Sequence, residues 1–169
     1  EREPHPVGRR EEPGAARHVG QLNILTWLIE HGDANVGNFL LSRAAASPRV
    51  FSVDNGVAFA YNESDRSDAW KKMRVERLPA DTVERLRRID RDELHRRLGV
   101  LAQWRLEQDR WIATPPDANL APHGGVRQED GVVQLGLRKW EIERVAQRLE
   151  QLLELVDDGR LGVLEEVRP

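Results

Sequence analysis

The sequence predicts a mainly helical α+β fold that contains one small β-hairpin. Apolar residues recur at helical spacing over residues 21–31 and again over 137–158, where they lie on one helical face. Between these stretches, two short apolar runs, "FLLS" and "RVFSV", are separated by "RAAASP", a pattern typical of a hairpin with a longer connection. The chain has 169 residues, enough for one domain with a hydrophobic core.

The first part of the chain sets the expected domain boundaries. Residues 1–20 are rich in Pro, Gly and charge, which indicates a flexible arm or linker, so the folded domain is expected over 21–169. "QLNILTWLIEH" predicts a buried helix that ends near His31, and "HGDANVGN" breaks the helical period and predicts a loop. After the hairpin, "DNG" at 54–56 predicts a turn, because Asn and Gly tolerate a positive φ.

The sequence after the hairpin predicts further helices. A short surface helix is expected in "SDRSDAWKKM", and another in "LPADTVERLRRI", which begins with Pro and an early Asp. "DRDELHRRLG" carries Asp90 and Glu93 at the spacing of a capping box, with Gly99 as a stop. "VLAQWRLEQDRWI" predicts one more helix, residues 113–132 predict a mobile loop, and Gly159 ends the last helix. The five Trp residues are expected to be large core side chains.

Composition excludes several classes of function. The net charge is -3, with both signs interspersed, which argues against a nucleic-acid-binding protein driven by a positive field. There is no Cys, so disulfides and thiolate metal sites are excluded, and no apolar run approaches the ~20 residues of a membrane span. Composition identifies no compartment, and the cytoplasm is the default expectation.

Three oxygen-bearing side chains form the candidate site. Asp33 and Asn38 lie in the loop before the hairpin, and Asp54 follows its second strand. Because the residue before the first strand of a hairpin and the residue after the second come close together, we expect Asn38 and Asp54 to be neighbours. Two such ligands beside phosphates suit Mg²⁺, and a separate carboxylate such as Asp33 accepts a hydroxyl proton. This is the division of labour in phosphoryl transfer.

These residues resemble the protein-kinase-like superfamily. "HGDANVGN" is similar to the H-G-D-x-x-x-x-N catalytic loop of aminoglycoside and choline phosphotransferases, and "SVDNGVAF" resembles the metal-binding segment that follows it. The pairing of D-x-x-x-G-N-F-L with D-N-G-x-A-F is closer to atypical branches: HipA-type kinases, phosphoinositide kinases and secretory-pathway kinases of the Golgi casein kinase type.

The resemblance implies a role for each site residue. Asp33 is implied as the catalytic base, and His31 as the residue that braces the catalytic loop. Asn38 and Asp54 are implied as the ligands of Mg²⁺ and hence of ATP. The helix at 21–30 and the helices after residue 79 then form a kinase-like C-terminal lobe. The implied substrates are a nucleotide and a molecule that bears a hydroxyl, either protein, lipid or small molecule.

The resemblance is specific over residues 21–61, and the sequence departs from the family in two ways. The atypical branches carry D-R-H at the loop, where this chain has Asp33-Ala34-Asn35. The part of the chain before the first helix has no Gly-rich loop, and no Lys precedes Lys71, so no N-terminal lobe is recognisable.

Several interpretations therefore stay open. The chain is a fragment of a kinase, or it receives its N-terminal lobe from a partner protein, or it is a catalytically incomplete, pseudokinase-like binding module. The acidic and amide residues are also common in ordinary turns, and an unrelated helical interaction protein with a chance motif is a further alternative.

Overall fold

The computed structural model describes residues 13–31, 36–41, 50–59 and 76–164, and every structural statement below refers to these residues. The chain divides into two compact units, which are treated separately: unit 1 comprises Glu1–Arg85 and Leu152–Pro169, and unit 2 comprises Leu86–Gln151. The helical elements are α1 (Pro13–Leu28), the 3-10 turn η2 (Val36–Asn38), α3 (Ala80–Leu86), α4 (Arg91–Leu98) and α5 (Lys139–Asp157).

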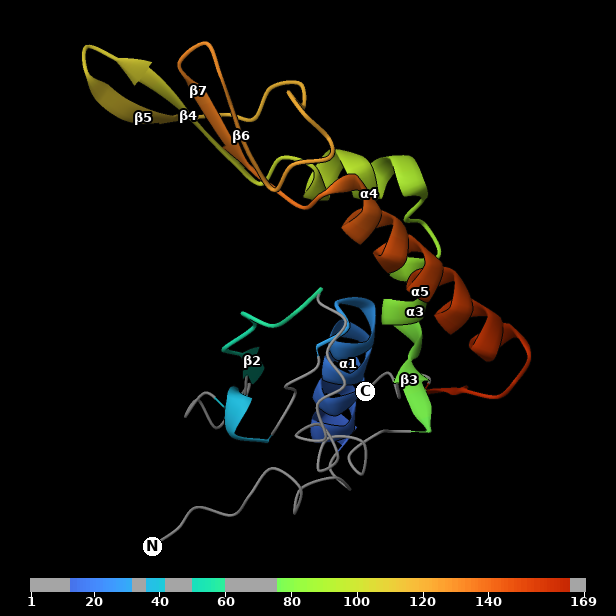
Figure 1. Cartoon of the computed structure of the whole chain (residues 1–169). Helices are drawn as coiled ribbons and strands as arrows, with labels where there is room; N and C mark the ends of the chain where they lie inside the picture. Colours follow the sequence, from blue (N-terminus) through green and yellow to red (C-terminus); the bar gives the residue numbers. More distant parts are fainter. Residues whose placement is uncertain (1–12, 32–35, 42–49, 60–75, 165–169) are drawn as a thin grey trace, which may run out of the picture. The chain divides into compact units, whose positions relative to one another are not determined.

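The strands form three separate sheets (Figure 1). Unit 1 contains an antiparallel pair, β1 (Phe39–Leu41) with β2 (Val50–Ser52), and a parallel pair, β3 (Arg77–Pro79) with β8 (Gly162–Leu164). Unit 2 contains a four-stranded antiparallel sheet in the order β5-β4-β7-β6. Its strands are β4 (Ala102–Glu107), β5 (Arg110–Thr114), β6 (Val126–Glu129) and β7 (Val132–Leu135).

In unit 1, α1 packs closely beside β3. Gly20 makes this possible, because a Cβ atom built at Gly20 would lie 2.9 Å from the Pro79 ring. An ion pair of 2.6 Å joins Arg17 of α1 to Asp81 in the first turn of α3. The buried apolar residues of this region are Val19, Leu22, Ile24, Leu78 and Val83. Leu25 and Trp27 of α1 are 38% and 36% exposed, so the helix is not buried throughout as predicted.

Helix α1 begins at Pro13, so residues 13–20, which the sequence assigned to the arm, are helical. Its C-terminal end carries the two hydrogen bonds of a Schellman motif: Glu30 N–H donates to the Trp27 carbonyl at 3.2 Å, and His31 N–H to the Thr26 carbonyl at 3.1 Å. Glu30 therefore occupies the left-handed position of the motif, with φ 49, where Gly is the usual residue. The helix ends three residues before His31, close to the predicted boundary.

In unit 2, α4 and α5 form where the sequence predicts helices. The Asp90 side chain caps α4 by accepting a hydrogen bond of 2.8 Å from the Glu93 amide, and Gly99 follows the last residue of the helix. The Glu143 carboxylate of α5 contacts two side chains of α4: it lies 2.8 Å from His95 Nε2, and it accepts a hydrogen bond of 2.7 Å from Arg91. The first part of α5 buries one apolar stripe, consisting of Ile142, Val145, Ala146 and Leu149.

The prediction of a mainly α fold is wrong, because residues 100–135 form a β-sheet. The predicted helix in "VLAQWRLEQDRWI" is instead the β4–β5 hairpin, which turns at Gln108 and Asp109 with φ values of 46 and 58. Two consecutive left-handed residues define a type I′ turn, whose twist matches that of the strands it joins. The residues of "RLEQ" favour a helix, but pairing with neighbouring strands outweighs this propensity, because tertiary context commonly determines the secondary structure of short segments.

The predicted loop at 113–132 also contains strands. Strand β6 lies inside it and joins β7 through a second two-residue turn at Asp130 and Gly131, with φ values of 45 and 72. Asp-Gly between two short runs is a strong hairpin signal, and here it stands in a segment whose Gly and Pro content is typical of a loop. The fold is therefore α+β with three sheets. The predicted surface helix in residues 64–73 lies outside the described residues.

The inner face of the four-stranded sheet is polar. Gln103 and Gln134 are buried opposite each other on β4 and β7, and the Gln134 amide donates to the Gln103 side-chain oxygen at 2.7 Å. The Gln103 amide nitrogen lies within bonding distance of the Pro115 carbonyl at 3.2 Å, and the Leu120 N–H donates to the Gln134 side chain at 3.1 Å. These bonds hold the connection between β5 and β6 against the sheet.

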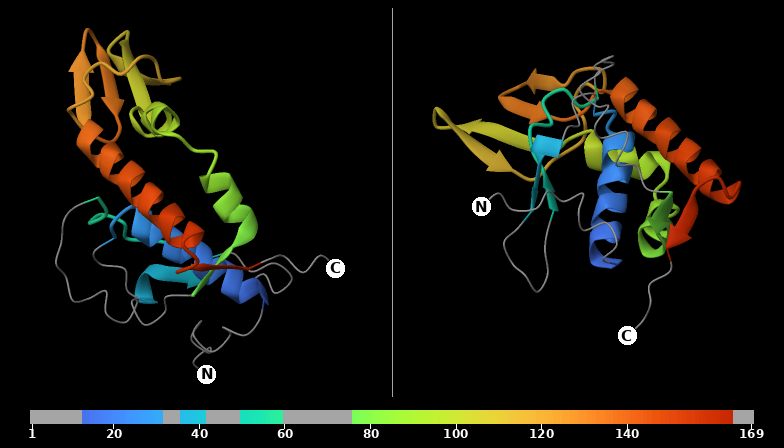
Figure 2. Two further views of the ribbon diagram at one scale, coloured as in Figure 1. Left: turned by 90° about the vertical axis from the view of Figure 1, so that its right-hand side faces the viewer. Right: turned by 90° about the horizontal axis from the view of Figure 1, so that it is seen from below.

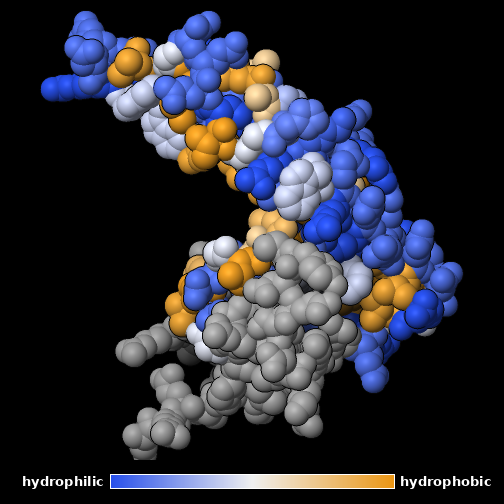
Figure 3. Space-filling model, in the orientation of Figure 1, coloured by the Kyte–Doolittle hydropathy of each residue, from blue (hydrophilic) through white to orange (hydrophobic). Residues whose placement is uncertain are grey.

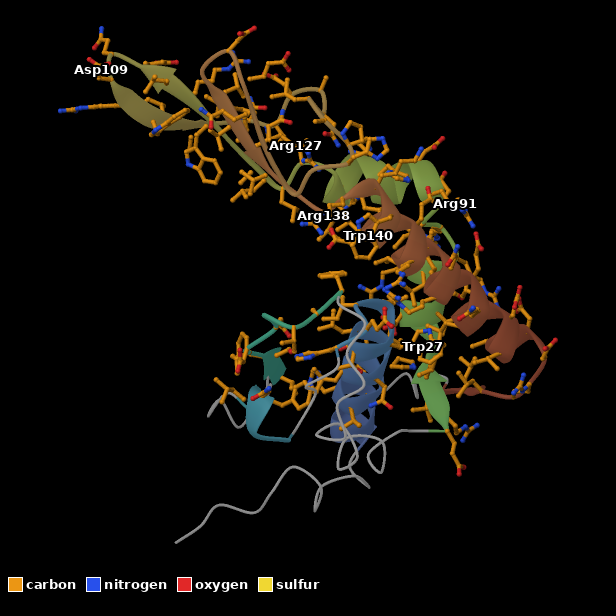
Figure 4. All side chains as sticks on the ribbon, viewed as in Figure 1. Trp27, Arg91, Asp109, Arg127, Arg138 and Trp140 are labelled. Atoms are coloured by element: carbon orange, nitrogen blue, oxygen red, sulfur yellow. The ribbon has the colours of Figure 1, made fainter. Side chains whose placement is uncertain are left out.

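Arg127 completes this buried polar cluster and is only 3% exposed (Figure 4). Its guanidinium donates to three backbone carbonyls: Ala121 at 2.8 Å, Leu137 at 2.8 Å, and Gly99. Burial lowers the pKa of Arg127 from its ordinary value. The arginine thus ties together the end of α4, the connection before β6 and the start of α5.

Candidate functional site

The β1–β2 hairpin determines where two of the predicted ligands lie. Phe39 pairs with Ser52, and one residue further along the ladder the Val53 N–H donates to the Asn38 carbonyl at 2.8 Å. Asn38 therefore stands at the entry of the hairpin, directly opposite the residue that precedes Asp54. The sequence predicted this hairpin, and the register brings the Asn38 backbone beside the segment that carries Asp54.

The segment after β2 folds into a tight turn that is tied at both ends. Ser52 Oγ and the Asn55 side-chain oxygen lie 2.8 Å apart, and the Ala58 N–H donates to the Asn55 carbonyl at 3.0 Å. Further on, the Phe59 N–H donates to the Ile29 carbonyl at 2.6 Å. The 53–59 segment is thus bonded to Ile29, at the end of α1, and to Asn38, and Asp33 lies between these two residues in the sequence.

Unusual backbone conformations gather in this region of unit 1. Glu30, Asp54 and Phe59 have φ values of 49, 55 and 64, although none of them is Gly. In unit 2, the non-glycine residues with positive φ all lie in two-residue hairpin turns that require this conformation. Glu30 occupies the left-handed position of the motif that ends α1, and Asp adopts a positive φ more readily than most residues, so Phe59 is the strained member of the three, because an aromatic residue is seldom left-handed. Strained residues of this kind concentrate at functional sites.

The side chains differ in their exposure. Asp54 is exposed, and within the described part of the chain its carboxylate makes no hydrogen bond or ion pair. Asn38 is half-buried. Beside them, Leu40 and Phe51 lie directly opposite each other on β1 and β2 and are 51% and 50% exposed. The hairpin therefore presents oxygen ligands and an apolar pair within a few residues of each other. Leu40 and Phe51 were not among the predicted site residues, although both belong to the short apolar runs "FLLS" and "RVFSV".

The other two predicted residues have different outcomes. His31 is 5% exposed at the end of α1, so its ring is buried next to the start of the loop. Asp33, the predicted base, lies outside the described residues. The structure thus brings together the Asn38 backbone and the Asp54 segment, and it buries His31 at the end of α1.

The ligand set fits a hard divalent cation better than a softer one. Over the described ranges, no group of three or more His, Cys, Asp or Glu residues is placed to hold a metal ion. Asp54 and Asn38 offer one carboxylate and one amide oxygen, and Mg²⁺ typically uses one or two protein ligands and completes its shell with water and phosphate oxygens. The residues present are therefore compatible with Mg²⁺ delivered with a nucleotide.

Comparison with known proteins yields no relative: no family model, no curated protein and no solved structure matches the chain. Among the helices that the structure describes, none is long and apolar enough to cross a membrane, in agreement with the sequence.

Proposed function

We propose that the chain is the C-terminal lobe of an atypical kinase, a Mg²⁺- and ATP-dependent phosphotransferase that moves a phosphoryl group to a hydroxyl. The observation that carries this proposal is the pair of backbone bonds between the two motifs. The Phe59 N–H donates to the carbonyl of Ile29, two residues before the H-G-D-x-x-x-x-N loop, at 2.6 Å. The Val53 N–H, directly before the D-N-G-x-A-F segment, donates to the carbonyl of Asn38, the last residue of that loop, at 2.8 Å. Phosphoryl transfer requires a base and metal ligands from these two segments to act at one place.

In this proposal, Asp33 is the general base. It accepts the proton of the substrate hydroxyl while the hydroxyl oxygen bonds to the γ-phosphorus, and the bond from that phosphorus to the bridging oxygen of ADP breaks. Asn38 and Asp54 are the residues that would hold Mg²⁺, which when bound would neutralise charge on the phosphate oxygens. His31, buried at the end of α1, braces the loop that it begins.

The exposed apolar pair supports a nucleotide as the ligand. A nucleotide offers a planar base as well as phosphates, and a base gains from an apolar surface of matching size. Leu40 and Phe51 provide such a surface on the same hairpin that ends in Asp54. A free metal ion or inorganic phosphate would make no use of it.

A thermal-shift titration of the chain with ATP and Mg²⁺ tests the binding part. A ligand at one hundred times its Kd adds about 2.7 kcal/mol to the free energy of unfolding, so the midpoint must rise if the native state binds. The informative variant is Asp54→Asn, because Asn tolerates the φ of 55 and removes only the charge. Asp158→Asn, also exposed in unit 1, is the matched control.

We expect a metal-dependent rise for the wild type and for Asp158→Asn, and none for Asp54→Asn. An equal rise in all three proteins would place the nucleotide elsewhere. Activity requires the N-terminal lobe, from the same or a separate polypeptide, and is measured on that complete enzyme. There Asp33→Asn should abolish phosphoryl transfer and leave nucleotide binding intact.

The second candidate is a pseudokinase-like binding module that keeps the scaffold and acts through its surface. The replacement of D-R-H by Asp33-Ala34-Asn35 favours it. It predicts no midpoint shift with ATP and Mg²⁺ and no loss of partner binding in Asp33→Asn.

A further inference from the structure

The open face of the four-stranded sheet in unit 2 is apolar. Residues directly opposite in an antiparallel ladder point to the same side, so the register assigns each residue to one face. Leu106 pairs with Trp111, Trp104 pairs with both Ala113 and Val133, and Leu135 pairs with both Ala102 and Val126. Gln128 is the remaining member, so this face carries no charged residue. We call this set the apolar sheet face: Ala102, Trp104, Leu106, Trp111, Ala113, Val126, Gln128, Val133 and Leu135.

The sheet is polar inside and apolar outside, the reverse of the usual arrangement. Gln103, Gln134 and Arg127 are buried on the inner face, whereas on the apolar sheet face Trp111 is 48% and Val126 is 68% exposed. Figure 3 shows apolar residues gathered over this part of the chain. The Trp residues were expected in the core, and Trp111 is instead one of the most exposed large side chains. An uncharged, Trp-bearing sheet face of this kind marks an interaction surface.

Charge at the two ends of the sheet is complementary. At the end with the two hairpin turns, Asp109 and Asp130 lie in the turns themselves, whereas Glu107, Arg110 and Glu129 belong by register to the inner face. The opposite end leads into α5 through Arg138 and Lys139, whose two positive charges exceed the single negative charge of Glu141 in the first turn of the helix. Figure 4 labels Asp109 at the far turn and Arg138 at the base of the sheet. Two such sheets laid face to face in opposite directions place the acidic end of one over the basic end of the other.

We propose that the apolar sheet face binds a second copy of this chain, by packing of the two sheets about a two-fold axis with opposite strand directions. An uncharged face meets itself without repulsion, and only the antiparallel arrangement matches the charges at both ends. Strands lie about 4.8 Å apart and rise about 3.4 Å per residue, so the face measures about 20 Å on each side. Two faces of about 400 Å² bury about 800 Å² in total, which is the size of a weak, transient interface, so we expect a dimer that forms only at micromolar or higher protein concentrations.

Sedimentation velocity tests the proposal on the whole chain from about 1 to about 300 μM, which spans the expected Kd. Trp111→Lys places a charge within the apolar sheet face, on the edge strand β5, and should raise the Kd at least tenfold. Ile112→Lys is the matched control: it is the next residue of β5, is 43% exposed, and lies on the other face of the sheet. We expect its Kd to stay within about twofold of the wild type.

Val126→Lys on the opposite edge strand repeats the test, so that a folding defect in one variant cannot decide it. Circular dichroism establishes that each variant is folded. About 1 M NaCl should also raise the Kd, because it screens the contacts between acidic and basic ends. A monomer at every concentration overturns the proposal, and so does a dimer that Trp111→Lys and Val126→Lys leave intact. If Ile112→Lys raises the Kd of the dimer as much as Trp111→Lys does, the dimer interface is not the apolar sheet face.

Discussion

The replacement Arg127→Met is expected to destabilise unit 2 by about 3 kcal/mol. Met keeps most of the aliphatic stem but donates no hydrogen bonds, so the Gly99 and Leu137 carbonyls lose the donor that the guanidinium supplies. The Ala121 carbonyl keeps a second donor, the Gly124 N–H at 3.1 Å. Each buried carbonyl left without a donor costs about 1–3 kcal/mol. Met also removes the free-energy cost of burying the Arg127 charge, and this offsets part of the cost of leaving the two carbonyls without a donor.

The free energy of unfolding in urea measures the effect, with circular dichroism as the probe. Arg110→Met is the control: Arg110 is exposed on β5, and its replacement should change stability by less than about 0.5 kcal/mol. Arg127→Lys adds a sharper test. Lys keeps the charge but cannot offer the planar fork that reaches three carbonyls, so we expect it to restore little of the loss. A loss below about 0.5 kcal/mol in Arg127→Met, or full recovery with Lys, would refute the reasoning.

Three further outcomes are expected. Asp109→Gly should raise the free energy of unfolding by about 1 kcal/mol, because Gly adopts the φ of 58 without strain; thermal unfolding measures it. Gly136→Ala should prevent unit 2 from folding normally, because its Cβ would collide with the Gly99 carbonyl; near-ultraviolet circular dichroism reports the loss of packing. Burial raises the pKa of Asp81, but hydrogen bonds from Arg17 and Arg85 outweigh it and hold the pKa below its ordinary value. The ionised Asp81 therefore stabilises the folded protein above the pKa of the unfolded state, and this contribution is lost as the pH falls through the pKa of the folded state. We expect Asp81→Asn to be less stable than the wild type at pH 7 and to differ little from it in acid. Urea unfolding midpoints measured across this pH range test the prediction.

The helices were predictable from the sequence because their signals are local. The Asp90 cap, the apolar stripe of α5 and the left-handed Gly159 at its end are each contained within a few residues. Gly159 N–H donates to the Val156 carbonyl at 3.0 Å, the bond expected of a glycine that ends a helix.

The four-stranded sheet was not predicted, because its strands break the usual pattern. A strand that alternates apolar and polar residues is expected to bury its apolar side, and here Gln103 and Gln134 are buried while Trp111 is exposed. The pairing of β4 with β7 joins residues about thirty positions apart, which no local window contains. Gln108-Asp109 is also a weaker turn signal than Asn-Gly.

The candidate site was predictable in part. The hairpin and the turn at 54–56 follow from short apolar runs and turn-forming residues, which the sequence displays directly. The bond between Phe59 and Ile29, and the left-handed φ of Phe59, depend on how segments thirty residues apart meet. No pattern in either segment alone contains that information.

The parallel pairing of β3 with β8 has a consequence for the order in which the chain matures. Strand β8 comes after all of unit 2 in the sequence, and its partner β3 comes before it (Figure 2). During synthesis, every residue of unit 2 is added to the chain before the segment that completes unit 1 is made. The unit that carries the candidate site is thus the last to close, and a ribosome that stalls within α5 would leave it without its final strand.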